Sequence, residues 1–190
     1  MSQRGTYTIE QQIVYTSATA PLSLPTYPST LLGVAAQYVG GSPIPLTVFE
    51  VLYASVTFPG LIAAAQVECY LGYITAMGST TNWTGQPGIT NHEFNDQAQH
   101  FTSYYQIKQG STEPTYGSGY GAWGREAMPA QSGWIYDPSK GKETSFLSPG
   151  QVGTAWAGAN GIGLRLLNFT PNALLASQIV NINMIVREIG

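Results

Sequence analysis

The sequence has little charge for its length. Charged residues make up 9% of its 190 residues, with seven Lys and Arg against ten Asp and Glu, whereas an average soluble domain has about 25%. Because a dispersed domain usually keeps a well-charged surface, much of this surface must be neutral, aromatic or covered by neighbouring molecules. Aromatic residues reach 12%, and aromatic enrichment with charge depletion is typical of interface cores. A monomer coated in Ser, Thr, Asn and Gln is the alternative.

The basic residues are too few and too scattered to form a phosphate-binding stripe. Strong nucleic-acid binding needs several clustered cations, and the net charge here is −3. We therefore expect no direct binding to nucleic acid. The basic residues are Arg4, Lys108, Arg125, Lys140, Lys142, Arg165 and Arg187.

Cysteine is almost absent, since Cys69 is the one cysteine of the sequence. A single cysteine excludes an internal disulfide framework and a Cys-rich metal site. Cys69 lies in an alternating apolar run, which indicates a buried structural thiol. The chain also has no secretory h-region and no long apolar run, so we expect neither a secretory signal nor a transmembrane span.

What the sequence does contain is alternation with a period of two, which is typical of half-buried strands. It is clearest at residues 174–189, where Val180 and Ile182 alternate with Asn181 and Asn183. Residues 161–169 alternate in the same way, so the chain closes on a predicted pair of core strands. Further strands are predicted at 7–15, 46–58, 66–75, 101–108, 134–136 and 151–157, with a strand or a helical turn at 31–38. Of these, 46–58 and 66–75 are predicted to form a long antiparallel pair.

The segments between these strands are predicted as loops and turns. Three prolines, Pro21, Pro25 and Pro28, forbid a helix or a central strand at 16–30, so we expect an extended arm or a wrapping loop there. Residues 78–88 and 110–124 are predicted loops, and 89–100 could hold a short helix. About eight strands with very uneven loops favour a single all-β domain over residues 1–190. Its expected architecture is a two-sheet antiparallel sandwich of jelly-roll type.

Two motifs with metal or nucleotide chemistry were weighed against simpler interpretations. Gly119, Gly121 and Gly124 have the dinucleotide-binding spacing, but that motif needs a strand before it and a helix after it. A Gly/Tyr-rich loop is favoured instead. His92, Glu93, Asp96 and His100 are residue types that bind metals. On one helix they cannot easily surround an ion, so we expect solvated residues, no metal site and no cofactor.

Catalytic signatures are weak. No Gly-x-Ser-x-Gly nucleophile motif occurs, and the acidic pairs Glu93 with Asp137 and Glu113 with Glu126 are of a kind that any chain contains. We therefore predict no catalytic residues. Aromatic residues in or beside loops could stack on sugars, fill a partner's pocket or close the ends of the core. They are Trp83, Trp123, Trp134, Trp156, Tyr116, Tyr120 and Tyr136.

The last two strands carry a resemblance to a known family. Residues 162–169, the Pro-containing turn after them and the closing strand from Ile179 to Ile189 resemble the last strands of single jelly-roll capsid or spike proteins of tailless icosahedral viruses and phages. The resemblance implies a β-sandwich that assembles with copies of itself or with a second coat protein. Coat proteins that package RNA often have a basic N-terminal arm, whereas this chain has only Arg4 there. The resemblance therefore favours shells that do not touch the genome, and leaves contact with an internal membrane or a glycan open.

Three functions follow as hypotheses. The leading one is a non-enzymatic virion structural protein, a capsid or coat subunit that works by self-assembly. The second is a carbohydrate-binding β-sandwich, a spike or lectin-like receptor-binding module, that would lose sugar binding on Trp83→Ala or Trp123→Ala. The third is a hydrolase that depends on Glu93 or Asp137, which the absence of a charged cluster disfavours.

Overall fold

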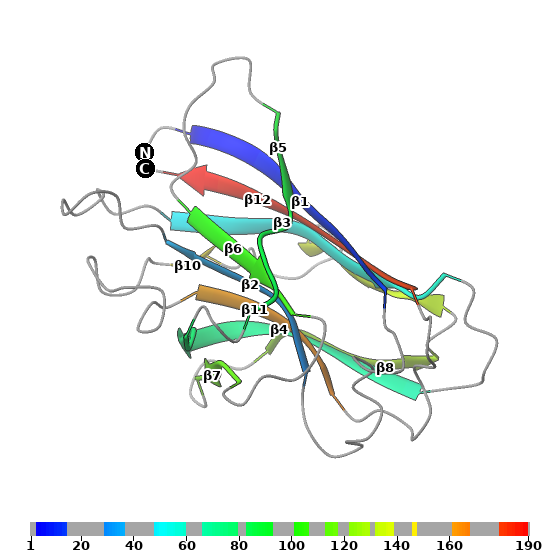
Figure 1. Ribbon diagram of the computed structural model, residues 1–190. Helices are drawn as coiled ribbons and strands as arrows, with labels where there is room; N and C mark the ends of the chain where they lie inside the picture. Colours follow the sequence, from blue (N-terminus) through cyan, green and yellow to red (C-terminus); the bar gives the residue numbers. More distant parts are fainter. Residues whose placement is uncertain are drawn as a thin grey trace.

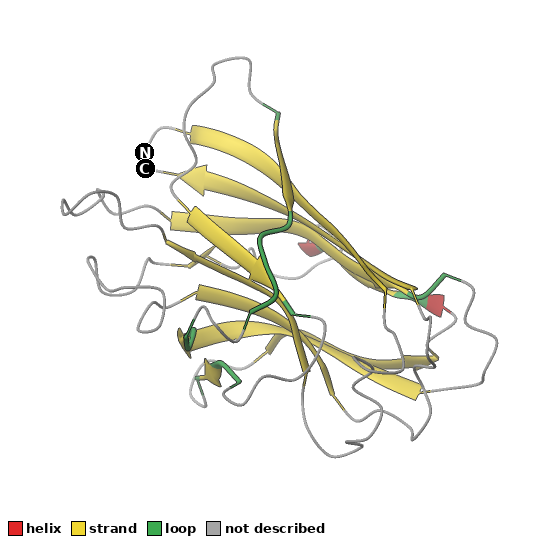
Figure 2. Cartoon of the chain, in the orientation of Figure 1, coloured by secondary structure: helices red, strands yellow, loops and turns green. Residues whose placement is uncertain are grey.

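The computed structural model describes most strands of the chain and some of the turns between them. The described residues are 3–14, 29–36, 48–59, 66–79, 83–92, 101–106, 113–117, 122–129, 132–138, 146–147, 161–167 and 179–189. They form β-strands almost throughout (Figure 2). The described residues include no apolar helix of membrane-spanning length.

The strands form two antiparallel sheets that pack face to face (Figure 1). The first sheet has the order β10-β3-β12-β1-β5, with β9 also paired to β3, and the second has the order β6-β2-β11-β4-β7, with β8 also paired to β4. The strands of the first sheet are β1 (Gln3–Val14), β3 (Val48–Thr57), β5 (Gly88–Asn91), β9 (Trp134–Tyr136), β10 (Phe146–Leu147) and β12 (Ile179–Ile189). Those of the second are β2 (Ser29–Ala36), β4 (Gln66–Ala76), β6 (Phe101–Tyr105), β7 (Thr115–Tyr116), β8 (Ala122–Pro129) and β11 (Gly161–Leu167).

The pairing order is that of a jelly roll. β1 pairs with β12, β2 with β11, β3 with β9 and β4 with β8, as if one long hairpin had been rolled up so that successive pairs fall in alternate sheets. β12 then also pairs with β3, and β11 with β4, which completes four neighbouring strands in each sheet. The predicted all-β jelly-roll sandwich is therefore confirmed, and the short strands β5, β7 and β10 and the strand β6 extend the sheets.

The core lies between the two sheets. Each long strand sends alternate side chains inward, because successive residues of a strand point to opposite faces. On β12 the inward residues are fully or almost fully buried, and those before Glu188 are apolar, as are the inward residues of β11 opposite. They are Val180, Ile182, Met184 and Val186 of β12, and Ile162, Leu164 and Leu166 of β11.

One predicted pairing is wrong. The strands at 46–58 and 66–75 exist as β3 and β4 but lie in different sheets. The closing strands β11 and β12 are both core strands as predicted, and they also lie in different sheets. The reason is topological, since the chain crosses from one sheet to the other between β3 and β4 and again between β11 and β12. Alternation identifies a strand and its buried face, but it does not identify the partner strand.

Two predicted loop regions also contain strands. β8 starts at Ala122, inside the predicted loop 110–124, and pairs with β4 from Pro129↔Gln66 to Ala122↔Gly72. β5 occupies 88–91, where a loop and a polar helical segment are predicted, because it pairs with β1. The strand or turn predicted at 31–38 is the strand β2. The prediction at 151–157 and most of the Pro-rich segment 16–30 lie outside the described residues.

Candidate functional site

The outer face of the first sheet presents a regular set of side chains, and we call it the polar sheet face. It is formed by the side chains that alternate with the core residues of β1, β12, β3 and β9. The register aligns them in rows, with Glu10 beside Asn183 and Ser55, and Thr8 beside Ile185 and Tyr53. Its members are Thr8, Glu10, Gln12, Val14, Tyr53, Ser55, Thr57, Ile135, Asn181, Asn183, Ile185 and Arg187.

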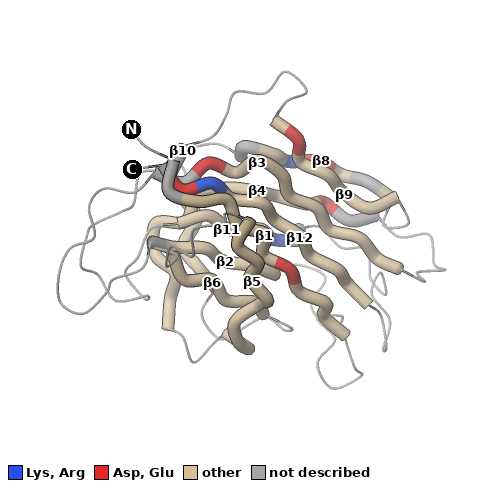
Figure 3. The backbone as a smooth tube through the Cα atoms, turned by 90° about the horizontal axis from the view of Figure 1, so that it is seen from above, with Lys and Arg blue, Asp and Glu red and all other residues tan. Residues whose placement is uncertain are grey.

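Charge is sparse on this face. Viewed from above, the strands of the first sheet are mostly neutral, with a few charged positions (Figure 3). Arg187 Nη1 donates a hydrogen bond to Glu50 Oε2 at 3.1 Å. The Glu50 side chain is 11% exposed, whereas that of Arg187 is 37% exposed. The pair is therefore anchored in the sheet and still presents a guanidinium outward.

Apolar side chains on the polar sheet face are exposed to solvent. Val14 is 49% exposed and Ile135 is 55% exposed, and these are the exposed large hydrophobic residues found among the described residues. Both belong to the first sheet and to its outer face, since Val14 follows Gln12 at a spacing of two and Ile135 lies opposite Ser55. A face that mixes neutral polar groups with exposed apolar ones resembles the surfaces that proteins use to bind other proteins.

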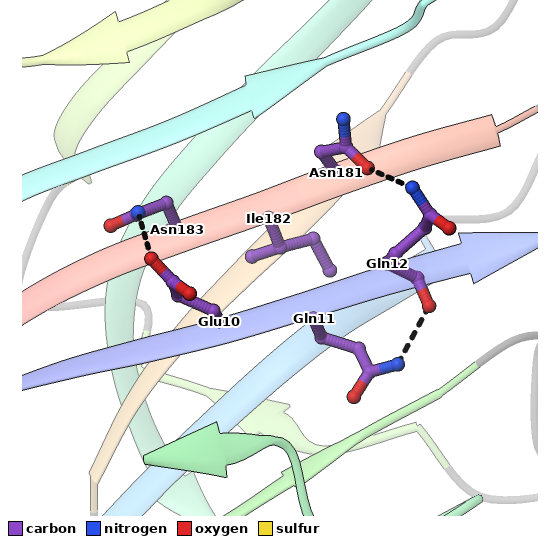
Figure 4. Close-up of a pocket in the computed structure, with 6 residues that line it drawn as sticks. All are labelled: Glu10, Gln11, Gln12, Asn181, Ile182 and Asn183. Carbon is purple, nitrogen blue, oxygen red and sulfur yellow. Dashed lines mark hydrogen bonds between the residues drawn. The ribbon is translucent and has the colours of Figure 1, made fainter. Parts of the chain in front are cut away.

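A shallow hollow of about 330 Å³ lies on this face across β1 and β12, toward the end where β1 finishes and β12 begins. Two cross-strand hydrogen bonds form its sides: Gln12 Nε2 donates to Asn181 Oδ1, and Asn183 Nδ2 donates to Glu10 Oε1, each at 3.1 Å (Figure 4). Asn183 Oδ1 is buried and has no hydrogen-bond partner among the described residues. The hollow therefore combines amides and one carboxylate that can hydrogen-bond to hydroxyls or to another polypeptide.

The outer face of the second sheet differs because the chain covers it. Trp83 and Met77 pack there with Ile74 and Ala35 as a second apolar cluster. Glycine makes the close packing feasible, since a Cβ on Gly33 would lie 2.6 Å from Cη2 of the Trp83 ring. Trp83 is only 6% exposed, and its indole Nε1 donates to the carbonyl of Met77 at 3.3 Å.

A cationic stack continues this cover. The Arg165 guanidinium lies 3.8 Å from the Tyr116 ring centroid and 4.4 Å from that of Tyr70, a cation–π arrangement. Thr30 Oγ1 lies 3.1 Å from the Tyr116 hydroxyl and donates to Glu113 Oε2 at 2.6 Å. Burial raises the pKa of the Tyr116 phenol well above its ordinary value. These contacts hold β7 on the second sheet, so this part of the outer face is occupied by the chain itself.

Of the aromatic residues for which contact and core roles were both open, several are packing residues. Trp134 and Tyr136 belong to the core, and Trp83 belongs to the second apolar cluster. Tyr116 is half-buried under Arg165. Trp123 lies in β8, whose side chain at that position is not described, and Trp156 and Tyr120 lie outside the described residues.

The predicted metal and catalytic candidates do not converge within the described residues. His92 Nε2 lies 2.5 Å from Thr8 Oγ1, whereas Glu93, Asp96 and His100 are not described. The described part of the chain contains no group of three or more His, Cys, Asp or Glu able to hold a metal ion. Of the two carboxylate pairs, Glu113 binds Thr30 and Glu126 is exposed on β8; Asp137 follows β9, and its partner Glu93 is not described.

The remaining motifs have structural explanations. Gly124, the last glycine of the dinucleotide-like spacing, pairs with Leu71 in β8 and does not begin a helix. Cys69 is buried as predicted, and burial, together with Glu126 and Glu68, raises its pKa. Arg125 pairs with Glu68 across β8 and β4.

In the sequence, the residues of the hollow are distinguished only as polar positions of two strands. Alternation placed Asn181 and Asn183 on the non-core face of the last strand. It did not reveal that Glu10 and Gln12 lie beside them, because that requires the register between β1 and β12. Compared with known proteins, the chain matches no family model and no curated protein sequence.

Proposed function

We propose that this chain is a virion structural protein, a capsid or coat subunit that acts without catalysis by assembling through protein–protein contacts. The observation that carries the proposal is the polar sheet face, which is nearly neutral and exposes Val14 and Ile135. The jelly-roll pairing order supports it, because this fold is common in viral capsid proteins, although lectin domains and cupins also use it. The low charge of the whole sequence fits a chain whose surface is largely covered by neighbours.

The partners that this function implies are copies of the same chain and a second coat protein, and the expected location is the virion. An isolated subunit would expose its assembly faces, so it should associate as its concentration rises. Contact with an internal membrane or with a glycan belongs to the same proposal as an additional role, and direct nucleic-acid binding does not.

The test is the mass of the purified native protein at micromolar concentration, by light scattering after size exclusion, with negative-stain microscopy of the same fractions. Stable oligomers or shells would support the proposal. A clean monomer at every concentration, also in mixtures with a second coat protein, would refute it.

The amide-lined hollow favours one alternative, a carbohydrate-binding β-sandwich. Gln12, Asn181 and Asn183 present side-chain amides on one surface, and amides are suited to hydrogen-bond sugar hydroxyls. This alternative moves the expected sugar site from Trp83, which is buried, to the polar sheet face. It predicts glycan binding that is lost on Asn181→Ala and kept on Val14→Ala, a matched change on the same face outside the hollow.

A further inference from the structure

The charged residues of the polar sheet face are arranged so that a second copy of the face complements the first. Along β12 the outward residues run Asn183, Ile185, Arg187, so Ile185 lies midway between the other two. Asn183 has the carboxylate of Glu10 at its side, and Arg187 carries the positive charge at the other end. The face thus carries the carboxylate of Glu10 on one side of Ile185 and the Arg187–Glu50 ion pair, whose guanidinium is the more exposed partner, on the other.

A two-fold axis in the plane of the interface, perpendicular to β12 and passing over Ile185, would use this arrangement twice. Rotation about this axis reverses the direction of β12 in the second copy. An outward residue of one copy then faces the residue of the other copy that lies equally far from Ile185 on the opposite side. Arg187 of one copy then lies over Asn183 and next to Glu10 of the other, and the reverse contact follows from the symmetry. Such self-complementary contact is the property of an isologous dimer interface.

The side chains have the hydrogen-bonding capacity for these contacts. A guanidinium has five N–H donors, of which Arg187 uses one on Nη1 for Glu50 Oε2; its Nε, which has no partner among the described residues, is buried and reaches a second copy only if the side chain turns. The 37% exposure of Arg187 lets the guanidinium turn toward a facing sheet about 10 Å away. Glu10 is exposed, and its Oε1 accepts one hydrogen bond from Asn183, which leaves room for a charge-assisted contact.

The centre of the contact would be less polar than its ends. Ile185 would pack on its own copy at the axis, and Tyr53, which lies beside Ile185 on β3, would do the same. From Asn181 to Ile189 the face is about 30 Å long at about 3.3 Å per residue, and three long strands, with the short β9 over part of the length, are about 14–19 Å wide. That footprint is about 400–600 Å² per copy, at or just below the lower end of stable interfaces, which bury about 600–1,000 Å² per partner.

We propose that two copies of this chain dimerise through their polar sheet faces about a two-fold axis over Ile185, with Arg187 of each copy bound to Glu10 and Asn183 of the other. The proposal rests on self-assembly as the proposed function and specifies which surface begins it.

The first test reverses one charge. Glu10→Arg places two cations together at both symmetric contacts, so the dimer should dissociate at about tenfold higher concentration or more in sedimentation velocity. The matched control is Val14→Arg, which introduces the same arginine on the same face of the same strand, with a charge change of +1 in place of +2. Val14 pairs with Ile179, whose mirror position lies beyond the end of β12, so this control should leave the dimer unchanged.

A charge-exchange variant makes the test specific to the proposed contact between Arg187 and Glu10. Glu10→Arg combined with Arg187→Glu exchanges the two charges, and this double variant should recover part of the wild-type association. Circular dichroism and thermal unfolding of each variant check that the subunit is folded, because Arg187→Glu also removes the ion pair with Glu50.

A cross-linking experiment tests the axis itself. Ile185→Cys brings two thiols together across the axis, and a short bismaleimide should link them. Thr57→Cys lies on the same face, opposite Asn181, far from its own copy in this arrangement, and should not be linked. The buried Cys69 provides no competing reactive thiol.

The outcomes separate this inference from the proposed function. Oligomers that persist unchanged in Glu10→Arg, or that are weakened equally by Val14→Arg, would overturn the dimer while self-assembly stands. Linkage of Thr57→Cys without linkage of Ile185→Cys would do the same. A wild-type chain that remains monomeric on its own overturns the dimer, and one that remains monomeric also with a second coat protein overturns both; glycan binding by that monomer would assign the face to a sugar.

Discussion

Gly33 provides a sharp test of how closely the second sheet is covered. A Cβ at this position would lie 2.6 Å from Cη2 and 3.2 Å from Cζ2 of Trp83, and 3.3 Å from Sδ of Met77. The Trp83 ring cannot yield by a simple rotation, because it is buried and its Nε1 is bonded to the Met77 carbonyl. Gly33→Ala should therefore overpack the cluster and lower the free energy of unfolding by about 2 kcal/mol. For a chain of this length that corresponds to a fall in Tm of about 4–8 °C.

Gly85 is the matched control, because the nearest atom to a Cβ there is Tyr105 Cε1 at 3.6 Å, an ordinary contact. Gly85→Ala should leave stability unchanged or raise it by up to about 1 kcal/mol, since alanine reduces the freedom of the unfolded chain. Urea denaturation followed by tryptophan fluorescence, at one protein concentration, measures both variants. Trp83→Phe removes the atoms that clash, so it should rescue part of the Gly33→Ala loss in a double-mutant cycle. Equal stability of Gly33→Ala and wild type would refute the packing argument.

Three further predictions concern the core and the ionisable groups. Met184→Ala, at a fully buried position on β12, should lower the free energy of unfolding by about 2–5 kcal/mol, seen as a lower urea midpoint with an unchanged slope; an unchanged midpoint would contradict the core assignment. Cys69 should resist iodoacetamide until the chain unfolds, because burial raises its pKa from an ordinary 9.0; rapid labelling of the native protein would contradict this. The raised pKa of Cys69 also makes stability depend on pH. Well below pH 9 the thiol is protonated in both the folded and the unfolded chain, so the pH has no effect through this group. Above pH 9 the unfolded thiol ionises while the folded one does not, so the free energy of unfolding falls as the pH rises. Tyr116→Phe should lower the free energy of unfolding by about 1 kcal/mol, because it removes the contact of the hydroxyl with Thr30. It should also reduce the loss of stability above pH 10, since burial raises the pKa of this phenol. An alkaline unfolding curve identical to that of wild type would contradict the second expectation.

The long strands of the fold could be predicted from the sequence because burial leaves a direct mark on it. Alternation at Val180, Ile182 and Met184 gives both the strand and its buried face, and the same holds for Leu164 and Leu166 of β11. A strand with one buried face needs that period of two. The all-β sandwich followed from these patterns together with the very uneven loops between the predicted strands.

The strand β8 could not be predicted in this way. It contains Gly124 and Glu126 and ends at Pro129, residue types that are depleted in strands. It is a strand because Arg125 and its neighbours pair with β4, a contact that depends on the rest of the fold. For the same reason the sequence indicated only part of the candidate site, the polar positions Asn181 and Asn183. The hollow itself depends on the register that brings β1 beside β12, two strands far apart in the sequence.

The pairing of β1 with β12 also affects how the chain acquires its structure. Gln3 lies opposite Ile189 and Val14 opposite Ile179, so the middle of the first sheet joins segments separated by most of the sequence, and their adjacent ends are visible in Figure 1. Pairings of such high sequence separation fold slowly, because the long intervening chain must first be ordered. During synthesis β1 leaves the ribosome early. The backbone N–H and C=O groups that pair with β12 in the folded chain have no partner until β12 has been made. In a crowded polysome the β12 of a neighbouring nascent chain is an equivalent partner, so exchange of this strand between subunits is the misfolding route that the topology makes most accessible.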